Sequence, residues 1–302
     1  MQLTFATRPS ALARWQTAHV IELLQAAHPE LECRELVLST HGDRVLDRPL
    51  PEIGGKGLFT TELEEALLSG QVHVAVHSLK DLPVEERPGI VIAAIPERDP
   101  AYDALVSAEP WMLSTLPEGA RVGTSSLRRT TQLLVRRPDL HVVPIRGNVD
   151  TRLRNMLDGE YDAVVLAQAG LTRLGLQAHI REVFSLDVML PAPGQGALAV
   201  QCRAGDVETL ELLTAIHDPV TAAAVRAERA FLSGLGGGCS LPIAAFAEKN
   251  SEVIILTGAV MSIDGKQDIR LSAADQEPQR LGERLATLVL ERGAAELLKI
   301  SV

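Results

Sequence analysis

The sequence predicts an α/β protein that ends in a smaller α+β unit, and two patterns carry this prediction. Short β-branched runs, such as residues 72–76, alternate with stretches of helical periodicity over most of the chain, which is typical of a mostly parallel sheet covered by helices. After a glycine-rich loop at 234–238 this alternation gives way to three consecutive strand patterns and one helix pattern. The chain has 302 residues, of which 46% are hydrophobic, and this is enough for two or three domains with cores of their own.

In the first unit, Leu63, Ala66 and Leu67 have the spacing of one buried helix face. The strands expected there are 3–6, 35–39, 72–76 and 90–95, and the helices are 11–27 and 60–69. The segment from Thr40 to Gly57 is rich in Gly and Pro, and we expect it to be a mobile lid without regular secondary structure.

A charged, proline-bearing stretch at 96–103 marks the crossover to a second unit with the same alternation. The strands expected there are 121–123, 141–145 and 163–167, with one helix reaching about residue 136 and another capped by Asp150. Residues 197–201 predict a further strand that returns to the first unit.

The last unit begins with a helix from Asp218 to about 232, because Asp218 is a capping residue and Pro219 suits the first helical position. A meander of three strands at 243–247, 253–261 and 267–272 follows, and a final helix is expected at 279–298. Asp264 and Gly265 predict the hairpin turn between the last two strands.

Composition and charge exclude several classes of function. A net charge of -10 argues against general nucleic-acid binding. The N-terminal residues lack the pattern of a signal peptide, and no apolar run is long enough to span a membrane. Cys33, Cys202 and Cys239 are far apart and form no C-x-x-C pair, so neither a metal site nor a redox dithiol is expected. We expect a cytoplasmic protein with reduced thiols.

Cys239 stands in a loop that contains four glycines in the five positions 234–238. Each glycine would cost about 1 kcal/mol in a helix interior, and a loop of this composition lets the backbone approach a bulky group closely. Two interpretations remain open. Cys239 is either a small buried thiol in a glycine turn or the attachment point of a covalently bound group.

Basic residues follow several of the expected strands. Arg8, Lys80 and Arg146 come directly after strands, Arg173 lies beyond another, and Arg128 and Arg129 lie in the first turn of a helix. Ligands of open α/β sheets bind at the carboxyl ends of the strands, and arginine suits bidentate recognition of carboxylate or phosphate. Each residue taken alone fits an ordinary solvated charge, whereas together they predict a cleft for a polyanion between two lobes.

Asp81 is the one carboxylate among these basic strand ends. It either pairs with Lys80 or caps the turn before Pro83, or it stabilises a developing cation and handles a proton beside a leaving amine. No residues form a nucleophile–base arrangement with Cys239. Gly57 occupies the position where a Walker loop has Ser or Thr, so no nucleotide site is predicted.

Taken together, the motifs resemble the porphobilinogen deaminase (hydroxymethylbilane synthase) family. The matching stretches are ATRPSALA at 6–13, GGKGLF at 54–59, HSLKDLP at 77–83, GTSSLRR at 123–129, RGNV at 146–149, PGQG at 193–196 and GGCSLPI at 237–243. They occur in order from end to end of the chain, and jointly they are very specific.

The resemblance implies two lobes similar to type II periplasmic binding proteins and a smaller C-terminal α+β domain with a three-stranded sheet. Domain 1 would comprise 1–96 and 197–215, domain 2 would comprise 102–191, and domain 3, with the cysteine loop, 217–302. It also implies a monomer.

The resemblance further implies that porphobilinogen units are joined head to tail with loss of ammonia, to give the linear tetrapyrrole hydroxymethylbilane. The chain would grow on a dipyrromethane cofactor held by a thioether to Cys239. Asp81, with Lys80, would be catalytic, close to the pyrrole nitrogens and the azafulvene cation. Lys56 and Phe59 would belong to the lid. The other residues implied to bind carboxylates of cofactor or substrate are Arg8, Ser10, Thr124, Ser126, Arg128, Arg129, Arg146, Arg152 and Arg173.

One position departs from the family pattern, because Thr61 stands where the family often has a lysine. This puts in doubt a positive charge at that position and not the reaction. The alternatives are a non-enzymatic anion-binding protein of the periplasmic-binding type and a cytosolic ligand-sensing module, although no helix-turn-helix pattern accompanies the latter.

Overall fold

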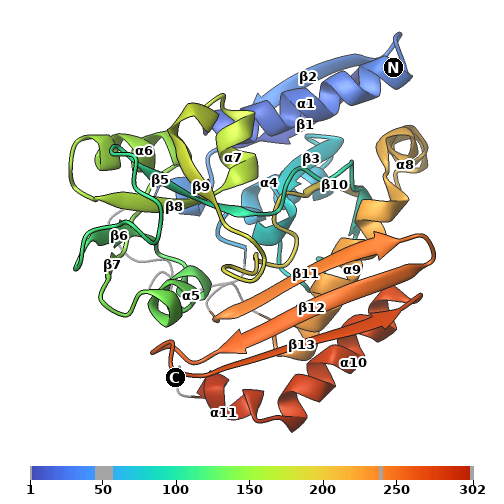
Figure 1. Cartoon of the computed structure of the whole chain (residues 1–302). Coiled ribbons are helices and arrows are strands. Elements are labelled where there is room, and N and C mark those ends of the chain that lie inside the picture. The colour runs from blue at the N-terminus through green and yellow to red at the C-terminus, as the bar shows by residue number, and fades with distance from the viewer. Residues whose placement is uncertain (1, 45–56, 238–240, 300–302) are drawn as a thin grey trace. The chain divides into compact units, whose positions relative to one another are not determined.

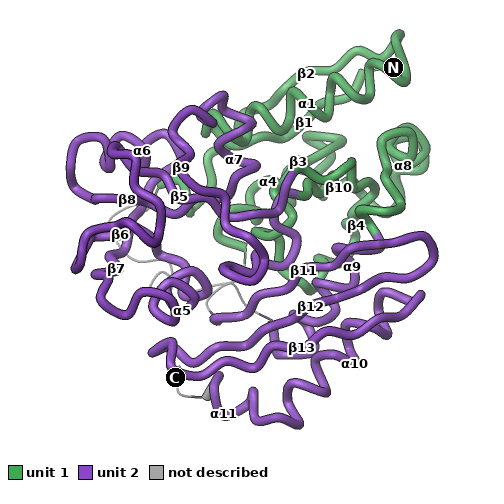
Figure 2. Tube along the Cα trace, in the orientation of Figure 1, with its two compact units in different colours: residues 1–99, 197–222 green, residues 100–196, 223–302 purple. Residues whose placement is uncertain are grey.

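The computed structural model describes residues 2–44, 57–237 and 241–299. The chain divides into two compact units (Figure 2), one made of residues 1–99 and 197–222 and the other of residues 100–196 and 223–302. Each unit is built around a five-stranded sheet, and the second unit has a further three-stranded sheet. None of the described helices has the length and hydrophobicity needed to cross a membrane.

The sheet of the first unit has the strand order β2-β1-β3-β10-β4. Its strands are β1 (Gln2–Thr7), β2 (Glu32–Val37), β3 (Val74–Ser78), β4 (Ile90–Ala94) and β10 (Leu198–Arg203). β1 is parallel to β2 and β3, whereas β10 is antiparallel to both β3 and β4. The predicted return of the chain to this unit at 197–201 is therefore confirmed, and the returning strand lies inside the sheet.

Helices cover both faces of this sheet (Figure 1). The helices and 3₁₀ turns of the unit are α1 (Ala11–Ala27), α2 (His41–Arg44), α4 (Thr61–Leu68), η1 (Leu79–Asp81), α8 (Val207–Leu213) and η3 (Thr214–Ile216). α1 packs Val20 and Leu24 against β1, β3 and β10, and α4 packs Leu63 and Leu67 on the opposite face. α1 begins where Ser10 accepts a hydrogen bond from Ala13 N at 3.3 Å, which satisfies one of the free N–H groups of the first turn.

The larger sheet of the second unit has the order β7-β6-β8-β5-β9, which repeats the arrangement of the first sheet. Its strands are β5 (Asp103–Ser107), β6 (Arg121–Gly123), β7 (His141–Val143), β8 (Ala163–Ala167) and β9 (Ile180–Val183). β6 is parallel to β7 and β8, and β5 is antiparallel to β8 and β9. The accompanying helices are α5 (Leu127–Arg136), α6 (Val149–Leu157), α7 (Gln168–Arg173) and the turn η2 (Gln177–His179).

The C-terminal part is an antiparallel meander with helices on one face (Figure 1). It comprises β11 (Ile243–Asn250), β12 (Val253–Met261), β13 (Asp268–Asp275), α9 (Pro219–Gly234), α10 (Pro278–Glu291) and α11 (Ala294–Lys299). Phe231 of α9 and Leu285 of α10 pack on the face of β12 that carries Ile254 and Leu256. The other face packs Ala244 and Met261 against Leu190. The predicted fold class is confirmed, with two α/β lobes and a smaller α+β part.

Several element boundaries differ from the predictions. Residues 32–37 form β2, three positions earlier than expected, and β3 starts at Val74 rather than residue 72. The predicted last helix is wrong as a single element, because Gly293, with φ 96, separates α10 from α11. Asn148, not Asp150, is the N-terminal cap residue of α6.

Among the described strands and α-helices, those not predicted at all are β5, β9, α2, α7 and α8. The prediction of no regular structure at Thr40 to Gly57 is wrong for 41–44, which form α2. The rest of that predicted lid, except Gly57, lies outside the described residues.

Candidate active site

Arg8 and Asp81 follow neighbouring strands of the first unit. β1 and β3 are parallel and adjacent, with Phe5 opposite Val74 and Ala6 opposite Ala75. The carboxyl ends of parallel neighbours meet at the same edge of a sheet. The residues after β1 and those after β3 therefore belong to one edge, as the sequence predicts.

Asp81 ends the short turn η1, whose position is set by apolar anchors. Leu79 is fully buried and Leu82 is 4% exposed. The N–H of Leu79 donates to the carbonyl oxygen of Ala197 at 3.0 Å, and that of Leu82 donates to the carbonyl oxygen of Leu79 at 3.2 Å. Asp81 itself is exposed, and Lys80 is half-buried.

The carboxylate of Asp81 makes neither an ion pair nor a side-chain hydrogen bond to any described residue. The predicted alternative of an Asp81–Lys80 pair is therefore not seen in this part of the chain, and neither is capping of the turn by the Asp81 side chain. The edge that also carries Arg8 thus presents a carboxylate that has no partner among the described residues.

Arg8 has protein contacts on one edge and one face of its guanidinium. It forms an ion pair with Asp43, in which Nε donates over 3.2 Å and Nη2 donates as well. Its Cζ atom lies 4.3 Å from the centre of the Phe59 ring, a cation–π contact. Of the predicted lid residues, Phe59 is therefore placed at Arg8, whereas Lys56 lies outside the described residues.

His77 is a buried imidazole of the same unit, in β3 just before the turn. The pKa of His77 is lowered to about 4, mainly by burial and in addition by the positive charge of Arg8, whereas the side chain of Gln201 acts in the opposite direction. The imidazole is therefore neutral at physiological pH.

In the second unit, Asp103 lies between the two arginines of the first turn of α5. Arg128 Nη1 donates to Asp103 Oδ2 at 2.6 Å, and Arg129 Nε donates to Oδ1 at 2.9 Å. Gln195 of the PGQG motif donates to the same carboxylate at 3.0 Å. Asp103 is fully buried and the two arginines are 4% and 6% exposed. The chain itself thus supplies an anion, the Asp103 carboxylate, beside the N-terminal turn of α5.

The two arginines differ in the N–H groups that the protein leaves available. Arg129 donates with Nη1 to the carbonyl oxygen of Val165 at 2.9 Å and places Nη2 2.7 Å from Asp103. Arg128 donates with Nη1 to Asp103 and to the carbonyl oxygen of Leu190, and its Nε and Nη2 make no hydrogen bond to the described residues.

The remaining predicted anion-binding residues of the second unit follow β6, β7 and β8. Ser125 ties two of these loops together, because its Oγ donates to the carbonyl oxygen of Ile145 at 2.7 Å and accepts from Ile145 N at 3.0 Å. Thr124 is buried and accepts a hydrogen bond from Ser126 N at 3.2 Å. This bond holds Ser126 at the start of α5.

Backbone carbonyls orient two further arginines. Arg152 Nε donates to the carbonyl oxygen of Gly147 at 2.8 Å. Arg173, 7% exposed, donates to that of Gly196 at 2.7 Å. The structure thus places Arg146 and Arg173 beyond the carboxyl ends of β7 and β8, as predicted, and Arg152 in α6.

Comparison with known proteins identifies the family. The family model described as "Porphobilinogen deaminase, dipyromethane cofactor binding domain" matches residues 3–211, and "Porphobilinogen deaminase, C-terminal domain" matches residues 222–291. The porphobilinogen deaminase of Moorella thermoacetica is 50% identical over 99% of this chain and 96% of its own length. That of Syntrophotalea carbinolica is 48% identical over 98% and 95%, respectively. The chain belongs to the porphobilinogen deaminase family.

Two solved structures to which the chain is similar have low sequence identity to it. The methionine-binding protein MetQ superposes with a TM-score of 0.47 at 12% identity, covering 73% of this chain and 92% of MetQ. The VFT2 domain of Bordetella pertussis BvgS gives 0.42 at 16% identity, covering 71% and 86%, respectively. The family assignment favours the predicted enzyme over the anion-binding alternative.

Cys239 of this porphobilinogen deaminase family member lies outside the described residues, which stop at Gly237 and resume at Leu241. α9 runs to Gly234, and Gly236 and Gly237 then adopt φ angles of 87 and 57. This is the left-handed conformation in which glycine is favoured. After the gap, Ile243 starts β11, so in the sequence Cys239 falls between α9 and β11.

Four carboxylate- or amide-bearing residues of the candidate site region were not predicted: Asp43, Asp103, Gln195 and Glu228. Glu228, fully buried in α9, accepts hydrogen bonds from Gly194 N at 2.6 Å and Ala247 N at 2.8 Å. Gln195 lies in the PGQG motif, but its partner Asp103 is 92 residues away in the sequence. The local sequence contains no signal for such long-range pairs.

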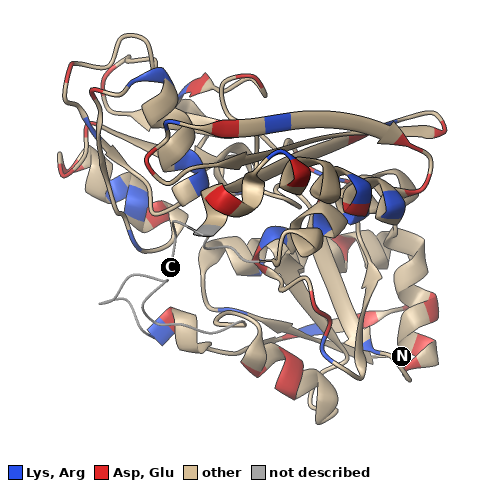
Figure 3. Ribbon diagram, turned by 90° about the horizontal axis from the view of Figure 1, so that it is seen from below, with Lys and Arg blue, Asp and Glu red and all other residues tan. Residues whose placement is uncertain are grey.

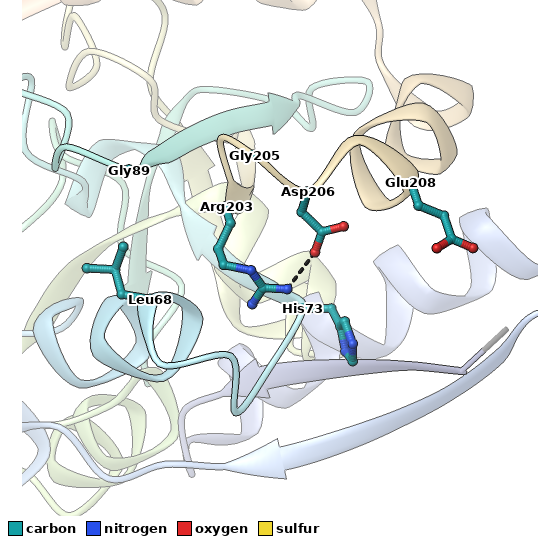
Figure 4. Close-up of a pocket in the computed structure, with 7 residues that line it drawn as sticks. All are labelled: Leu68, His73, Gly89, Arg203, Gly205, Asp206 and Glu208. Carbon is teal, nitrogen blue, oxygen red and sulfur yellow. Dashed lines mark hydrogen bonds and ion pairs between the residues drawn. The ribbon is translucent and has the colours of Figure 1, made fainter.

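A hollow in the first unit lies at the opposite end of β3 from Asp81 (Figure 4). It is lined by residues that include Leu68, His73, Arg203 and Asp206. Arg203 donates to Asp206 at 2.6 Å and to two backbone carbonyls, and His73 Nδ1 accepts from Thr4 N. These polar groups serve the fold rather than a ligand.

Charge elsewhere is mixed, with basic and acidic segments interspersed along the ribbon (Figure 3). Among the described residues, no cluster of His, Cys, Asp and Glu has the arrangement of a metal site.

Proposed function

We propose that this chain is a hydroxymethylbilane synthase that joins porphobilinogen units head to tail with loss of ammonia. The observation that carries the proposal is the exposed carboxylate of Asp81, which has no partner among the described residues and lies at the sheet edge that also carries Arg8. Both residues lie within the part matched by the cofactor-binding family model. The expected product is the linear tetrapyrrole hydroxymethylbilane.

The donor groups of the chain fit a dipyrromethane cofactor that bears carboxylate arms. Arg128 keeps Nε and Nη2 without a hydrogen bond to the described residues. Arginine N–H groups in such surroundings suit carboxylates. When bound, the cofactor would supply the pyrrole carbon to which incoming units are joined.

We assign the anion-binding roles to the residues that the family resemblance implies. Arg8, Ser10 and Lys80 of the first unit, and Arg128, Arg146, Arg152 and Arg173 of the second, would bind carboxylates of cofactor or substrate. Thr124 and Ser126 would add hydroxyl donors. Arg129 would chiefly orient Asp103, because the protein already engages its Nε, Nη1 and Nη2 groups.

Asp81 would stabilise the positive charge that develops on the pyrrole nitrogen of porphobilinogen as ammonia leaves. A fixed opposite charge at a developing cation lowers the barrier without reorganisation during the step. Lys80, the preceding residue, would hold a substrate carboxylate. His77, in the strand that precedes the turn, is neutral and adds no competing positive charge.

Cys239 would form the thioether to the cofactor. The support is its place in a loop opened by left-handed glycines and closed by a buried strand. We also propose that the protein acts as a cytoplasmic monomer without a nucleic-acid partner. Its net charge of -10 and the free thiols of Cys33 and Cys202 are in keeping with this.

Intact mass and product formation test the proposal together. Purified protein should weigh two pyrrole units more than its sequence and convert porphobilinogen to hydroxymethylbilane. Cys239→Ala should fold, lack the added mass and make no product, whereas Cys33→Ala, a change at a half-buried free thiol, should behave like the wild type. Wild-type protein with the plain sequence mass and no turnover would refute the proposal.

A further inference from the structure

We propose that Asp43 is a positioning residue for Arg8, which it holds so that the Nη1 side of the guanidinium is offered to a ligand carboxylate. The inference rests on the proposed function, in which Arg8 binds a carboxylate of cofactor or substrate. Neither the matching motifs nor the strand pattern predicts a functional role for Asp43.

The carboxylate of Asp43 is itself held firmly. Its Oδ2 atom accepts hydrogen bonds from Thr40 N at 3.1 Å, Thr40 Oγ1 at 2.8 Å and Arg8 Nε at 3.2 Å, while Oδ1 accepts from Arg8 Nη2. Burial alone would raise the pKa of Asp43, but the hydrogen bonds and charge of Arg8 and the hydrogen bonds from Thr40 outweigh it, and the pKa is lowered. Asp43 therefore stays ionised and paired near neutral pH.

A second contact restrains the plane of the guanidinium. The ring of Phe59 lies against it at 4.3 Å from Cζ to the ring centre. The same ring packs against Gly42, where a Cβ atom would come within 2.2 Å of Phe59 Cε1. Gly42 N also donates to the carbonyl oxygen of Leu58 at 2.9 Å. α2 and the residues before α4 are thus joined, and together they fix both an edge and a face of Arg8.

The N–H groups of Arg8 that Asp43 does not use form a defined donor surface. A guanidinium has five N–H donors, and Asp43 uses Nε and one N–H of Nη2. Nη1 makes no hydrogen bond to the residues that the structure describes. Because the Nε–Nη2 edge is already taken by Asp43, a ligand carboxylate meets the remaining donors from the Nη1 side.

The pairing also sets how strongly Arg8 attracts an anion. Asp43 balances the charge of Arg8, so binding there depends on directed hydrogen bonds more than on net charge. Such a contact selects a carboxylate by its position and holds it less tightly than an unpaired arginine would. This suits a ligand that is extended by successive units.

The chain offers a matched control on the same short helix. Arg44, next to Asp43, donates to Glu62 at 2.9 Å, and this pair does not contact Arg8. Glu62→Gln removes one ion pair of α2 without changing the guanidinium of Arg8. Asp43→Asn keeps the size of the side chain but provides one oxygen where two accept hydrogen bonds.

The test combines Asp43→Asn, Arg8→Gln, the double variant and Glu62→Gln. For each we would measure the fraction of chains carrying the cofactor by intact mass, kcat and KM for porphobilinogen, and the thermal unfolding midpoint. Asp43→Asn should lower kcat/KM roughly tenfold, the scale of one lost charge-assisted hydrogen bond, and should reduce cofactor loading. In the Arg8→Gln background it should change neither quantity further, because Asp43 acts through Arg8.

Three outcomes would overturn the assignment. Equal effects of Asp43→Asn in both backgrounds would show that Asp43 acts independently of Arg8. An equal loss in Glu62→Gln would show that only the stability of α2 matters. Wild-type loading and kinetics in Arg8→Gln would remove Arg8 itself from the ligand site, even if Cys239 and product formation still supported the proposed function.

Discussion

Glu228 Oε2 lies 2.6 Å from the backbone nitrogen of Gly194, and the other oxygen of this carboxylate accepts from Ala247 N at 2.8 Å. One buried side chain thereby joins the PGQG loop to β11, the strand that follows the cysteine loop. Ala245 N also donates to the carbonyl oxygen of Pro191 at 3.0 Å. The loop and the strand are therefore tied at two points.

Glu228→Leu should destabilise the second unit, because it leaves two buried N–H groups without acceptors. At about 1–3 kcal/mol for each group, the loss is about 2–6 kcal/mol in the free energy of unfolding. Urea denaturation would measure it, with Glu248→Leu, at an exposed position of β11, as the control. Equal stability of the two variants would show that the Glu228 contacts are not needed.

Asp103→Asn should be destabilising by about 3–5 kcal/mol, because it leaves Arg128 and Arg129 buried without their shared counter-charge. Asp139→Asn provides the comparison, since Asp139 pairs with Arg137 at the surface. Surface pairs contribute little, so this variant should unfold almost like the wild type. Of the two variants, only Asp103→Asn should also reduce the fraction of protein that carries the cofactor. A fully stable and fully loaded Asp103→Asn protein would contradict this prediction.

His77 should make stability depend on pH. Its folded pKa is about 4, below the value of about 6.5 expected in the unfolded chain. The unfolded state therefore binds the proton first, and the free energy of unfolding falls as the pH drops from about 6.5 towards 4. This contribution is about 3 kcal/mol at most.

A His77→Gln protein should lose less stability than the wild type between pH 7 and pH 4.5. His141→Gln, at an exposed position, should retain the wild-type slope. Denaturant midpoints over this range would show the difference. Parallel curves for wild type and His77→Gln would mean that His77 does not titrate differently in the folded state.

Asp81→Asn should lower turnover by about 10²–10³, the usual cost of removing one preorganised charge partner. The fold should be unaffected, since Asp81 has no ion pair or side-chain hydrogen bond within the described chain. Steady-state kcat with unfolding curves would test both statements, with Glu86→Gln as an exposed control on the same connection. Unaltered turnover would remove the central group from the proposed mechanism.

The local sequence pattern was sufficient to predict single strands and the residues that follow them. β6 and β8 have the predicted bounds. Arg8 lies directly after β1 and Lys80 lies in the turn after β3, as the strand pattern predicts. The individual ligand roles of these residues stay predictions.

Local pattern failed where partners are distant. Arg8 and Arg128 were predicted as cations for a ligand, but their protein partners, Asp43 and Asp103, are 35 and 25 residues away. β5 was missed because its five buried residues follow a charged, proline-bearing stretch and pair with strands much later in the chain. Gly293 broke the last helix although the periodicity continued across it.

The place of β10 between β3 and β4 has a consequence for synthesis. Val200 of β10 pairs with both Val76 of β3 and Ala94 of β4. β3 and β4 are synthesised early, but β10 is synthesised only after all strands of the larger sheet of the second unit. While the nascent chain emerges, the facing edges of β3 and β4 have no partner, and open strand edges invite pairing with other chains. The first unit can close only after the ribosome has passed residue 203, so the half that is translated first is completed last.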